Sequence, residues 1–205
     1  RDDRVLRIVE HADAGEEERE IHEVNTSIYC FRRGLLAPAL RRLSPENAQG
    51  EYYLSDVVEV LADAGYSVVS LVSPDPVETA GVNDRAQLAT AEAELRDRTN
   101  ERWMRRGVTM VDPERTYIDM SVEIAADVTL FPGTILRGTT TIAGGAEIGP
   151  DSSLLDTEVG ERAVVEYTVA RQATIGSDAR VGPFATLHSG AKVPDGTVTG
   201  PYHQI

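Results

Sequence analysis

The sequence predicts an α/β unit over residues 1–83, a connector helix over residues 84–106, and a parallel β-helix over residues 107–205. Three observations predict this division. The first region alternates strand-like and helix-like patterns, as α/β units do. The second is a charged, helix-like segment that ends at Gly107. The third repeats a branched aliphatic residue every six positions, which is typical of a solenoid.

The first region contains three strand candidates, residues 5–9, 24–31 and 67–72, which are rich in β-branched and aromatic residues. Between them, residues 51–64 place Leu54, Val57, Val58 and Leu61 at the spacing of one helix face. Strands that alternate with helices indicate an α/β unit. The region offers fewer strands than a complete doubly wound domain, so we expect only the end of one.

The connector helix has clear start and stop signals. Asp84 is a suitable N-cap, and Gly107 ends the pattern. Leu88, Ala91 and Leu95 recur on one face, while Arg, Glu and Asp occupy most other positions. We expect this helix to join two domains.

The third region is an array of hexapeptide repeats. The aliphatic positions are Ile118, Ile124, Leu130, Leu136, Ile142, Ile148 and Leu154, and the spacing resumes at Ile175, Val181, Leu187 and Val193. Mostly small residues stand four positions after them. Each repeat forms one short strand and a turn, and three repeats form a coil whose aliphatic side chains are buried by stacking. Around residues 156–172 the register slips, so we expect a looser coil or a protruding loop there.

Composition excludes some partners. The chain has 34 acidic and 20 basic residues, a formal net charge of −14. This charge disfavours nucleic acid and anionic membrane surfaces as main partners, and no apolar run is long enough to span a membrane. The single cysteine, Cys30, lies in an apolar run and is expected to be buried; a reducing cytoplasm fits this usage. The chain begins with Arg1 in a turn-like run, so we expect a fragment of a longer protein.

Four stretches carry a resemblance to a known family. They are Arg7-Ile8-Val9-Glu10-His11-Ala12-Asp13-Ala14, Glu23-Val24-Asn25-Thr26, Asn47-Ala48-Gln49-Gly50-Glu51-Tyr52-Tyr53-Leu54-Ser55-Asp56 and Gly81-Val82-Asn83-Asp84-Arg85. In order and spacing they resemble the bifunctional N-acetylglucosamine-1-phosphate uridyltransferase / glucosamine-1-phosphate acetyltransferase family. The third stretch is the most specific, and it argues against another sugar-phosphate nucleotidyltransferase with a β-helix tail.

The resemblance implies a function for each region. Residues 1–83 would be the C-terminal part of a Rossmann-like nucleotidyltransferase domain, which makes UDP-N-acetylglucosamine from UTP with Mg²⁺. Residues 107–205 would be a truncated left-handed β-helix, which forms a homotrimer and transfers an acetyl group from acetyl-CoA to glucosamine-1-phosphate. The family is cytoplasmic and supplies peptidoglycan and cell wall synthesis.

Three residues match the family's sugar-nucleotide site. Glu10 resembles the carboxylate that binds the sugar, Asn25 its amide partner, and Asn83 the Mg²⁺ ligand that also contacts UDP-N-acetylglucosamine. Each has a simpler interpretation. Glu10 could be a solvated turn residue, Asn25 could have a structural partner, and Asn83 could cap the connector helix.

The chain also departs from the family. No Gly-rich phosphate loop precedes a helix, and the acidic residue that shares Mg²⁺ is absent. His188 stands where the family has a phosphate-binding Arg, residues 201–204 do not match the family, and His203 is expected to be a surface residue. We therefore expect no catalytic residue in this chain and neither activity from it alone. The alternative is a non-catalytic trimerising scaffold with a vestigial sugar site. We also expect fraying beyond Val193.

Overall fold

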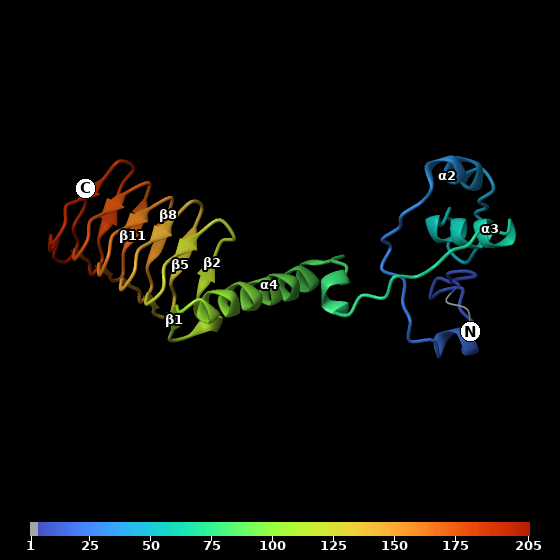
Figure 1. Cartoon of the computed structure of the whole chain (residues 1–205), viewed down its shortest axis with the longest axis horizontal. Coiled ribbons are helices and arrows are strands. Elements are labelled where there is room, and N and C mark those ends of the chain that lie inside the picture. The colour runs from blue at the N-terminus through green and yellow to red at the C-terminus, as the bar shows by residue number, and fades with distance from the viewer. Residues whose placement is uncertain (1–3) are drawn as a thin grey trace. The chain divides into compact units, whose positions relative to one another are not determined.

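The structure is a computed structural model that describes residues 4–205. It divides into two compact units, the first ending at Val82 and the second comprising Asn83–Ile205 (Figure 1). None of the helices among the described residues is both long enough and apolar enough to cross a membrane.

The second unit contains a parallel β-solenoid, which confirms the fold predicted from the six-residue repeat. Three five-stranded parallel sheets form its faces, in the orders β1-β4-β7-β10-β13, β2-β5-β8-β11-β14 and β3-β6-β9-β12-β15. The strands are β1 (Thr109–Met110), β2 (Tyr117–Ile118), β3 (Glu123–Ile124), β4 (Thr129–Leu130), β5 (Ile135–Arg137), β6 (Thr141–Ile142), β7 (Glu147–Ile148), β8 (Ser153–Leu155), β9 (Glu158–Val159), β10 (Val164–Val165), β11 (Val169–Arg171), β12 (Thr174–Ile175), β13 (Arg180–Val181), β14 (Thr186–Leu187) and β15 (Lys192–Val193).

The repeated aliphatic side chains point into the prism and form one continuous core. Leu130, Leu136, Ile148 and Leu154 are fully buried. The mostly small residue four positions after each aliphatic residue lies at a corner of the prism. Where it is Thr or Ser, its hydroxyl can form hydrogen bonds with buried backbone groups. Thr134 Oγ1, for example, donates to the carbonyl oxygens of Phe131 at 2.7 Å and Ile148 at 3.1 Å. The corner therefore takes a residue of limited size, and a Thr or Ser there also bonds to the buried backbone.

The expected loop at residues 156–172 does not form. After Leu154 the inward positions continue at Val159, Val165 and Ala170, and two of these three steps contain five residues in place of six. The shortened steps still pair in register, as Ile142 with Val159 shows. The prediction was wrong because the ladder depends on the inward residue of each strand, and a turn can lose one residue without moving it.

Residues 194–205 continue the stack. Parallel bridges join Val198 to Arg180 and Gln204 to Thr186. The Thr186 amide donates to the carbonyl oxygen of His203 at 2.8 Å. The Tyr202 ring stacks on Phe184 with centroids 5.3 Å apart. These bonds do not support the predicted fraying beyond Val193, although the stretch lacks the family motif.

Helix α4 (Arg85–Arg105) is the predicted connector. Its N-cap is Asp84, whose Oδ1 accepts from the Gln87 amide at 2.7 Å, and the chain leaves the helix at Gly107 with a φ of +96°. The buried face differs from the predicted one. Leu88 and Leu95 are exposed, while Thr99, Asn100 and Trp103 are buried.

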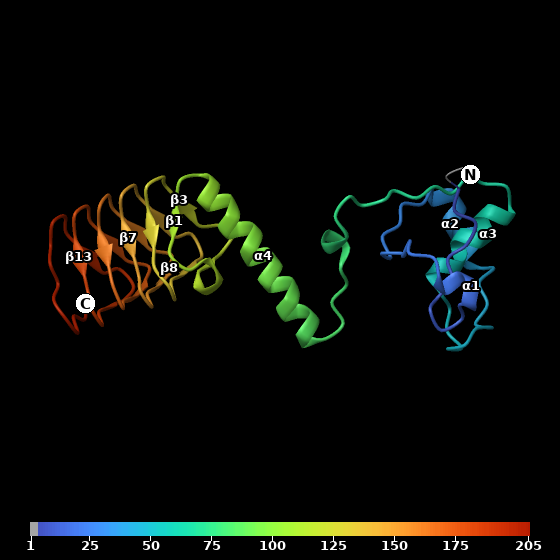
Figure 2. The same cartoon turned by 90° about the horizontal axis from the view of Figure 1, so that it is seen from below.

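The C-terminal half of α4 covers the first coil (Figure 2). Trp103 joins the core formed by the coil aliphatics. Asn100 Nδ2 donates to the carbonyl oxygens of Pro113 and Thr116 at 2.8 and 3.0 Å, around the short 3₁₀ helix η3 (Pro113–Arg115). A solenoid needs a cap where its first coil would otherwise expose the core. The connector helix therefore also acts as this cap.

The first unit is helical where it is regular, and a Rossmann-like fold is not evident in it. Its elements are α1 (Glu16–Arg19), α2 (Arg33–Leu40), η1 (Leu54–Asp56), α3 (Val57–Asp63) and η2 (Pro76–Thr79). The helix predicted at 51–64 is present as η1 and α3, whereas α2 was not predicted. Ala39, Val57 and Leu61 form the centre of a small core.

The three predicted strands of this unit are absent. One antiparallel bridge, Arg4 to Val69, and one bond from the Val5 amide to the Val68 carbonyl at 3.0 Å are what remains of pairing between residues 4–9 and 67–72. A strand requires neighbours on which to form a ladder, and the described residues of this unit supply no further partners. Cys30, which lies within the predicted strand 24–31 and was expected to be buried, is exposed.

Candidate functional site

Two of the family-like stretches meet in the first unit. Ser55 Oγ donates to Glu10 Oε1 at 3.1 Å, and the Ala48 amide donates to Asp13 Oδ1 at 2.7 Å. These bonds join residues 7–14 to residues 47–56. Glu10 is therefore a half-buried carboxylate with a defined partner, which differs from the solvated turn residue of the simpler interpretation.

Acidic side chains surround the contact between residues 7–14 and residues 47–56. Burial raises the pKa of Tyr53, with further contributions from Asp13, Glu10 and Glu51. Burial also raises the pKa of Asp56, and the neighbouring carboxylates of Glu59, Glu10 and Asp13 add to it. Among residues 4–205, the buried Tyr53 hydroxyl has no hydrogen-bond partner. Such a site favours hydrogen-bond donors, such as sugar hydroxyls, over anions.

Asn25 has a local structural role. Its Nδ2 donates to the Tyr29 hydroxyl at 2.7 Å, and its Oδ1 accepts from the Ser27 amide at 3.2 Å. Ser27 has a φ of +59°, so the segment turns here and does not extend as a strand. Among the hydrogen bonds of residues 4–205, none joins Asn25 to Glu10.

Asn83 stands at the start of α4 in the second unit. Its backbone amide donates to Gln87 Oε1 at 2.6 Å, whereas Asp84 supplies the side-chain cap. The capping role considered for Asn83 therefore belongs to its neighbour. Within the described part of the chain, no hydrogen bond engages the Asn83 side chain.

The residues present do not form a Mg²⁺ site by themselves. Residues 4–205 contain no group of three or more His, Cys, Asp or Glu side chains that could hold a metal. Asn83 offers one amide oxygen, and Oδ1 of the adjacent Asp84 accepts from a backbone amide. Mg²⁺ requires six oxygen ligands, several of which can be water or phosphate. A carboxylate from elsewhere would still be needed.

His188 follows β14 on the surface of the solenoid. Its backbone amide donates to the Ile205 carbonyl at 2.7 Å, which leaves the imidazole outside the ladder. In the turn that follows, Ser189 Oγ donates to Gln172 Oε1 at 2.7 Å. Arg171, at the end of β11, lies on the rung next to His188. No signal in the sequence links Arg171 to His188, because the two residues are 17 positions apart and only the coil length brings them together.

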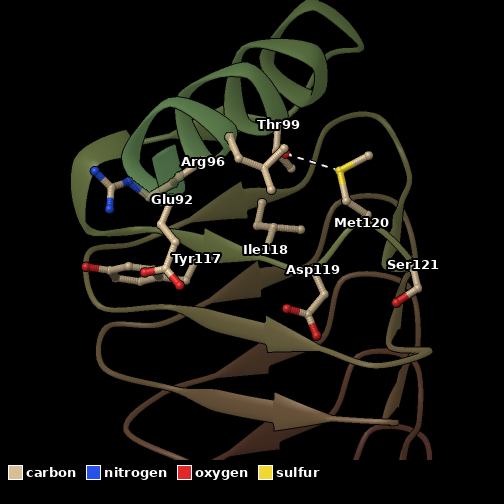
Figure 3. A pocket seen from close by; sticks show the side chains of 9 residues that line it. Glu92, Arg96, Thr99, Tyr117, Ile118, Asp119, Met120 and Ser121 are labelled. Carbon is tan, nitrogen blue, oxygen red and sulfur yellow. Dashed lines mark hydrogen bonds between the residues drawn. The ribbon is translucent and has the colours of Figure 1, made fainter. Parts of the chain in front are cut away.

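An open cavity of about 430 Å³ lies between α4 and the first coil (Figure 3). The Arg96 guanidinium lies over the Tyr117 ring at 5.3 Å, and Thr99 Oγ1 donates to Met120 Sδ at 3.4 Å. Its lining mixes apolar and charged side chains: Glu92, Leu95, Arg96, Thr99, Tyr117, Ile118, Asp119, Met120 and Ser121. No motif in the sequence pointed to this cavity, because its two walls come from different elements.

Known proteins resemble the chain over nearly all of its length. A bifunctional protein GlmU from Brevibacillus brevis is 45% identical over 201 residues, which is 98% of this chain and 44% of that protein. The bifunctional protein GlmU from Rhodococcus jostii is 49% identical over 189 residues, 92% of this chain and 38% of that protein. The chain thus spans somewhat less than half the length of these curated relatives. These matches confirm the resemblance predicted from the four stretches.

Other comparisons add little. No protein-family model matches the chain. Among solved structures, PerB from Caulobacter crescentus in complex with CoA and GDP-perosamine is 19% identical and covers 70% of this chain and 86% of its own. The TM-score of that match is 0.30.

Proposed function

Because nearly all of this chain resembles part of the bifunctional GlmU proteins, we propose that it is part of an enzyme of UDP-N-acetylglucosamine biosynthesis. The parent enzyme would transfer an acetyl group from acetyl-CoA to glucosamine-1-phosphate. It would then transfer a uridylyl group from UTP to the product with the help of Mg²⁺. The end-to-end similarity is the observation that carries this proposal. A cytoplasmic location goes with these substrates.

The chain alone would catalyse neither reaction. Uridylyl transfer depends on positioning and charge neutralisation of phosphates, and the described residues contain no group of three or more His, Cys, Asp or Glu side chains that could hold a metal. The first unit leaves many apolar side chains exposed, among them Leu6, Val24, Ile28 and Leu71. We propose that sheet strands in the rest of the parent protein cover them, since the relatives are more than twice as long as the matched stretch.

The sugar half-site would consist of Glu10, Asn25 and Asn83. A carboxylate accepts hydrogen bonds from sugar hydroxyls, and an amide both donates and accepts. Glu10 already accepts from Ser55, which orients one of its oxygens and leaves the other available. Asn25 would have to exchange its bonds to Tyr29 and Ser27 for bonds to the N-acetyl sugar. Asn83 would offer its oxygen to Mg²⁺ and to the nucleotide sugar.

Calorimetry of the full chain with UDP-N-acetylglucosamine and Mg²⁺ tests the half-site. We expect weak binding that Asn83→Ala abolishes, because this change removes the one ligand oxygen without removing the helix cap. Asp84→Ala is the matched control. It removes the cap bond to Gln87, which costs about 1 kcal/mol of helix stability, but it leaves the ligand amide in place. Binding that survives Asn83→Ala would refute the assignment of Asn83.

A non-catalytic scaffold with a vestigial sugar site is the second candidate. The internal bonds of Asn25 favour it, because they satisfy both ends of that amide without a ligand. This candidate predicts no binding of UDP-N-acetylglucosamine to the chain or to any longer form that contains it. Binding by a longer form, lost on Asn83→Ala, would exclude it.

Trimerisation and left-handed winding are also proposed from the resemblance. One solenoid face presents Tyr117, Ile135 and Val169 outward at the same position of β2, β5 and β11, with Ser153 at that position of β8. Leu155, two residues further along β8, lies between Arg137 and Arg171. The face formed by β3, β6, β9, β12 and β15 presents polar residues at the equivalent positions: Glu123, Thr141, Glu158, Thr174 and Lys192. The apolar stripe of Tyr117, Ile135 and Val169 on a strongly charged molecule is a suitable contact between copies.

A further inference from the structure

The cavity between α4 and the first coil has free hydrogen-bond acceptors in its wall. Figure 3 shows Glu92 extending from α4 toward β2, and Asp119 following β2 on the other side of Ile118. Among residues 4–205, no hydrogen bond or ion pair engages the Glu92 carboxylate. Asp119 Oδ2 accepts from the Gly138 amide at 3.0 Å, and within the same part of the chain its other oxygen accepts no bond. The cavity therefore presents carboxylate oxygens that the described residues do not use.

Arg96 does not neutralise these carboxylates. It is the one basic side chain among the described residues that line the cavity. Glu92 stands four positions earlier on α4, the spacing at which helical ion pairs form, yet the ion pairs of residues 4–205 do not include one between the two. The Arg96 guanidinium instead lies over the Tyr117 ring at 5.3 Å, and its Nε is 3.9 Å from Asp97 Oδ1. The lining thus keeps an excess of negative charge.

The rest of the lining combines apolar side chains with hydroxyls that already donate. Leu95, Ile118 and Met120 supply apolar surface. Thr99 Oγ1 donates to Met120 Sδ at 3.4 Å, and Ser121 Oγ donates to a backbone carbonyl at 2.6 Å. The volume of about 430 Å³ lies within the range of small-molecule sites. An occupant that fits this lining has an apolar body and a group that donates hydrogen bonds to carboxylates.

We propose that this cavity binds an organic ammonium ion, a small molecule with a cationic amine on an apolar body. The body would pack against Ile118 and Met120, and the ammonium would donate to Glu92 and to the free oxygen of Asp119. An ammonium carries three donors and no acceptor, which matches a lining with free acceptors. The two carboxylates disfavour anions of the same shape. The site lies apart from Glu10, Asn25 and Asn83, so it does not depend on the proposed function.

Three indole compounds of similar shape test the proposal, because at neutral pH tryptamine is a cation, tryptophol is neutral and indole-3-acetate is an anion. Each is titrated into the full chain labelled with carbon-13 at the methionine methyl groups, and binding is followed by NMR. We expect tryptamine to shift the methyl signal of Met120, which lines the cavity, more than those of Met104 and Met110. Tryptophol should bind about fivefold more weakly, the effect of losing a charge-assisted hydrogen bond. Indole-3-acetate should bind more weakly still.

Glu92→Gln removes the charge from the cavity and keeps the size of the side chain. It should weaken the binding of tryptamine about fivefold and change that of tryptophol by less than about twofold. Glu94→Gln is the matched control on the same turn of α4. Glu94 Oε1 accepts from Arg98 Nε at 2.6 Å, and Glu94 is not part of the cavity lining. This variant should change the binding of neither compound by more than about twofold.

Several outcomes would overturn the proposal. They are no tryptamine binding at millimolar concentration, equal shifts of the three methionine methyl signals, and equal losses of tryptamine binding in Glu92→Gln and Glu94→Gln. Tryptophol or indole-3-acetate binding as tightly as tryptamine would show that the cavity does not select cations, which also overturns it. Neither carboxylate is buried, so circular dichroism should show unchanged unfolding for both variants.

Discussion

Individual residues at the solenoid corners carry unusual backbone conformations. Arg162 and Asp178 have φ values of +55° and +56°, in the left-handed region that costs a non-glycine residue about 1–2 kcal/mol. Gly145 stands one coil earlier with a φ of +73°. Arg162 and Asp178 form a bidentate ion pair with both distances at 2.8 Å, and Arg162 also reaches Glu161 at 2.9 Å. The ion pair partly offsets the backbone cost.

The Arg162–Asp178 pair has a predictable pH dependence. The hydrogen bond from Arg162 lowers the pKa of Asp178 below its ordinary value. The ionised carboxylate therefore stabilises the folded state at neutral pH, and this contribution is lost as the pH falls below about 3.8 through the lowered pKa. We expect Arg162→Ala to lower the unfolding midpoint slightly at pH 7 and to have less effect at pH 3. Denaturant unfolding at the two pH values measures it.

Arg162→Gly is the control for this pair, because it removes the same side chain and relieves the left-handed backbone. Its unfolding midpoint at pH 7 should exceed that of Arg162→Ala. If the two variants unfold alike, the backbone at this corner is not strained. If Arg162→Ala has the same effect at both pH values, the ion pair does not contribute.

At the scale of elements, the sequence of α4 predicts where the helix begins and ends but does not predict its buried face. The cap at Asp84 and the stop at Gly107 could be predicted, because they depend on local hydrogen bonds and on glycine's backbone freedom. The buried face could not be predicted in this way. It consists of Thr99, Asn100 and Trp103, two of which are polar, and a search for apolar periodicity selects Leu88 and Leu95 in their place.

Asn100 tests the capping role of α4. Asn100→Ala removes the donor that serves the Pro113 and Thr116 carbonyls. The Pro113 carbonyl still accepts from the Thr116 amide, but the Thr116 carbonyl loses this donor, and a buried acceptor left unsatisfied costs about 1–3 kcal/mol. We expect a loss of that size in the free energy of unfolding of the solenoid, measured by denaturant unfolding. Glu101→Ala, on the same helix, breaks an exposed pair with Arg105 and should cost less than about 0.5 kcal/mol. Equal losses in the two variants would contradict a cap at Asn100.

At the scale of the whole molecule, the contrast between solenoid faces predicts self-association through the face of β2, β5, β8, β11 and β14. Val169 and Thr174 occupy equivalent outward positions on the apolar face and on the polar face of β3, β6, β9, β12 and β15. We expect the chain to sediment as a trimer at concentrations on the order of tens of micromolar. Val169→Asp should shift it to monomer, because a charge would be buried in the contact, whereas Thr174→Asp should not.

A monomer of the unchanged chain at that concentration would argue against the trimer. Dissociation by Thr174→Asp but not by Val169→Asp would place the contact on the polar face. The first unit exposes apolar side chains of its own, such as Leu71, which is 99% exposed. Detergent-free buffers with low salt and a range of chain concentrations would separate a defined trimer from nonspecific association.

Repeating and local signals in the sequence predicted the corresponding parts of the structure. The aliphatic positions from Ile118 to Leu154 predicted the solenoid, because each coil buries the same position of the next. The four family-like stretches predicted the relatives. Glu10 and the run from Asn47 were recognised as motifs, but their contact through Ser55 and Ala48 joins segments about 35 to 45 positions apart, and sequence alone does not show it.

The sequence by itself determined the period of the solenoid, the ends of α4 and the family that the chain resembles, since all three depend on residue spacing and local residue type. The tertiary structure alone decided which turns could shorten, that Arg171 stands beside His188, and that residues 5–9, 24–31 and 67–72 do not form a sheet. These outcomes depend on neighbours distant in sequence. A turn can shorten because the ladder holds the strands on either side of it, and a strand exists only where another strand pairs with it.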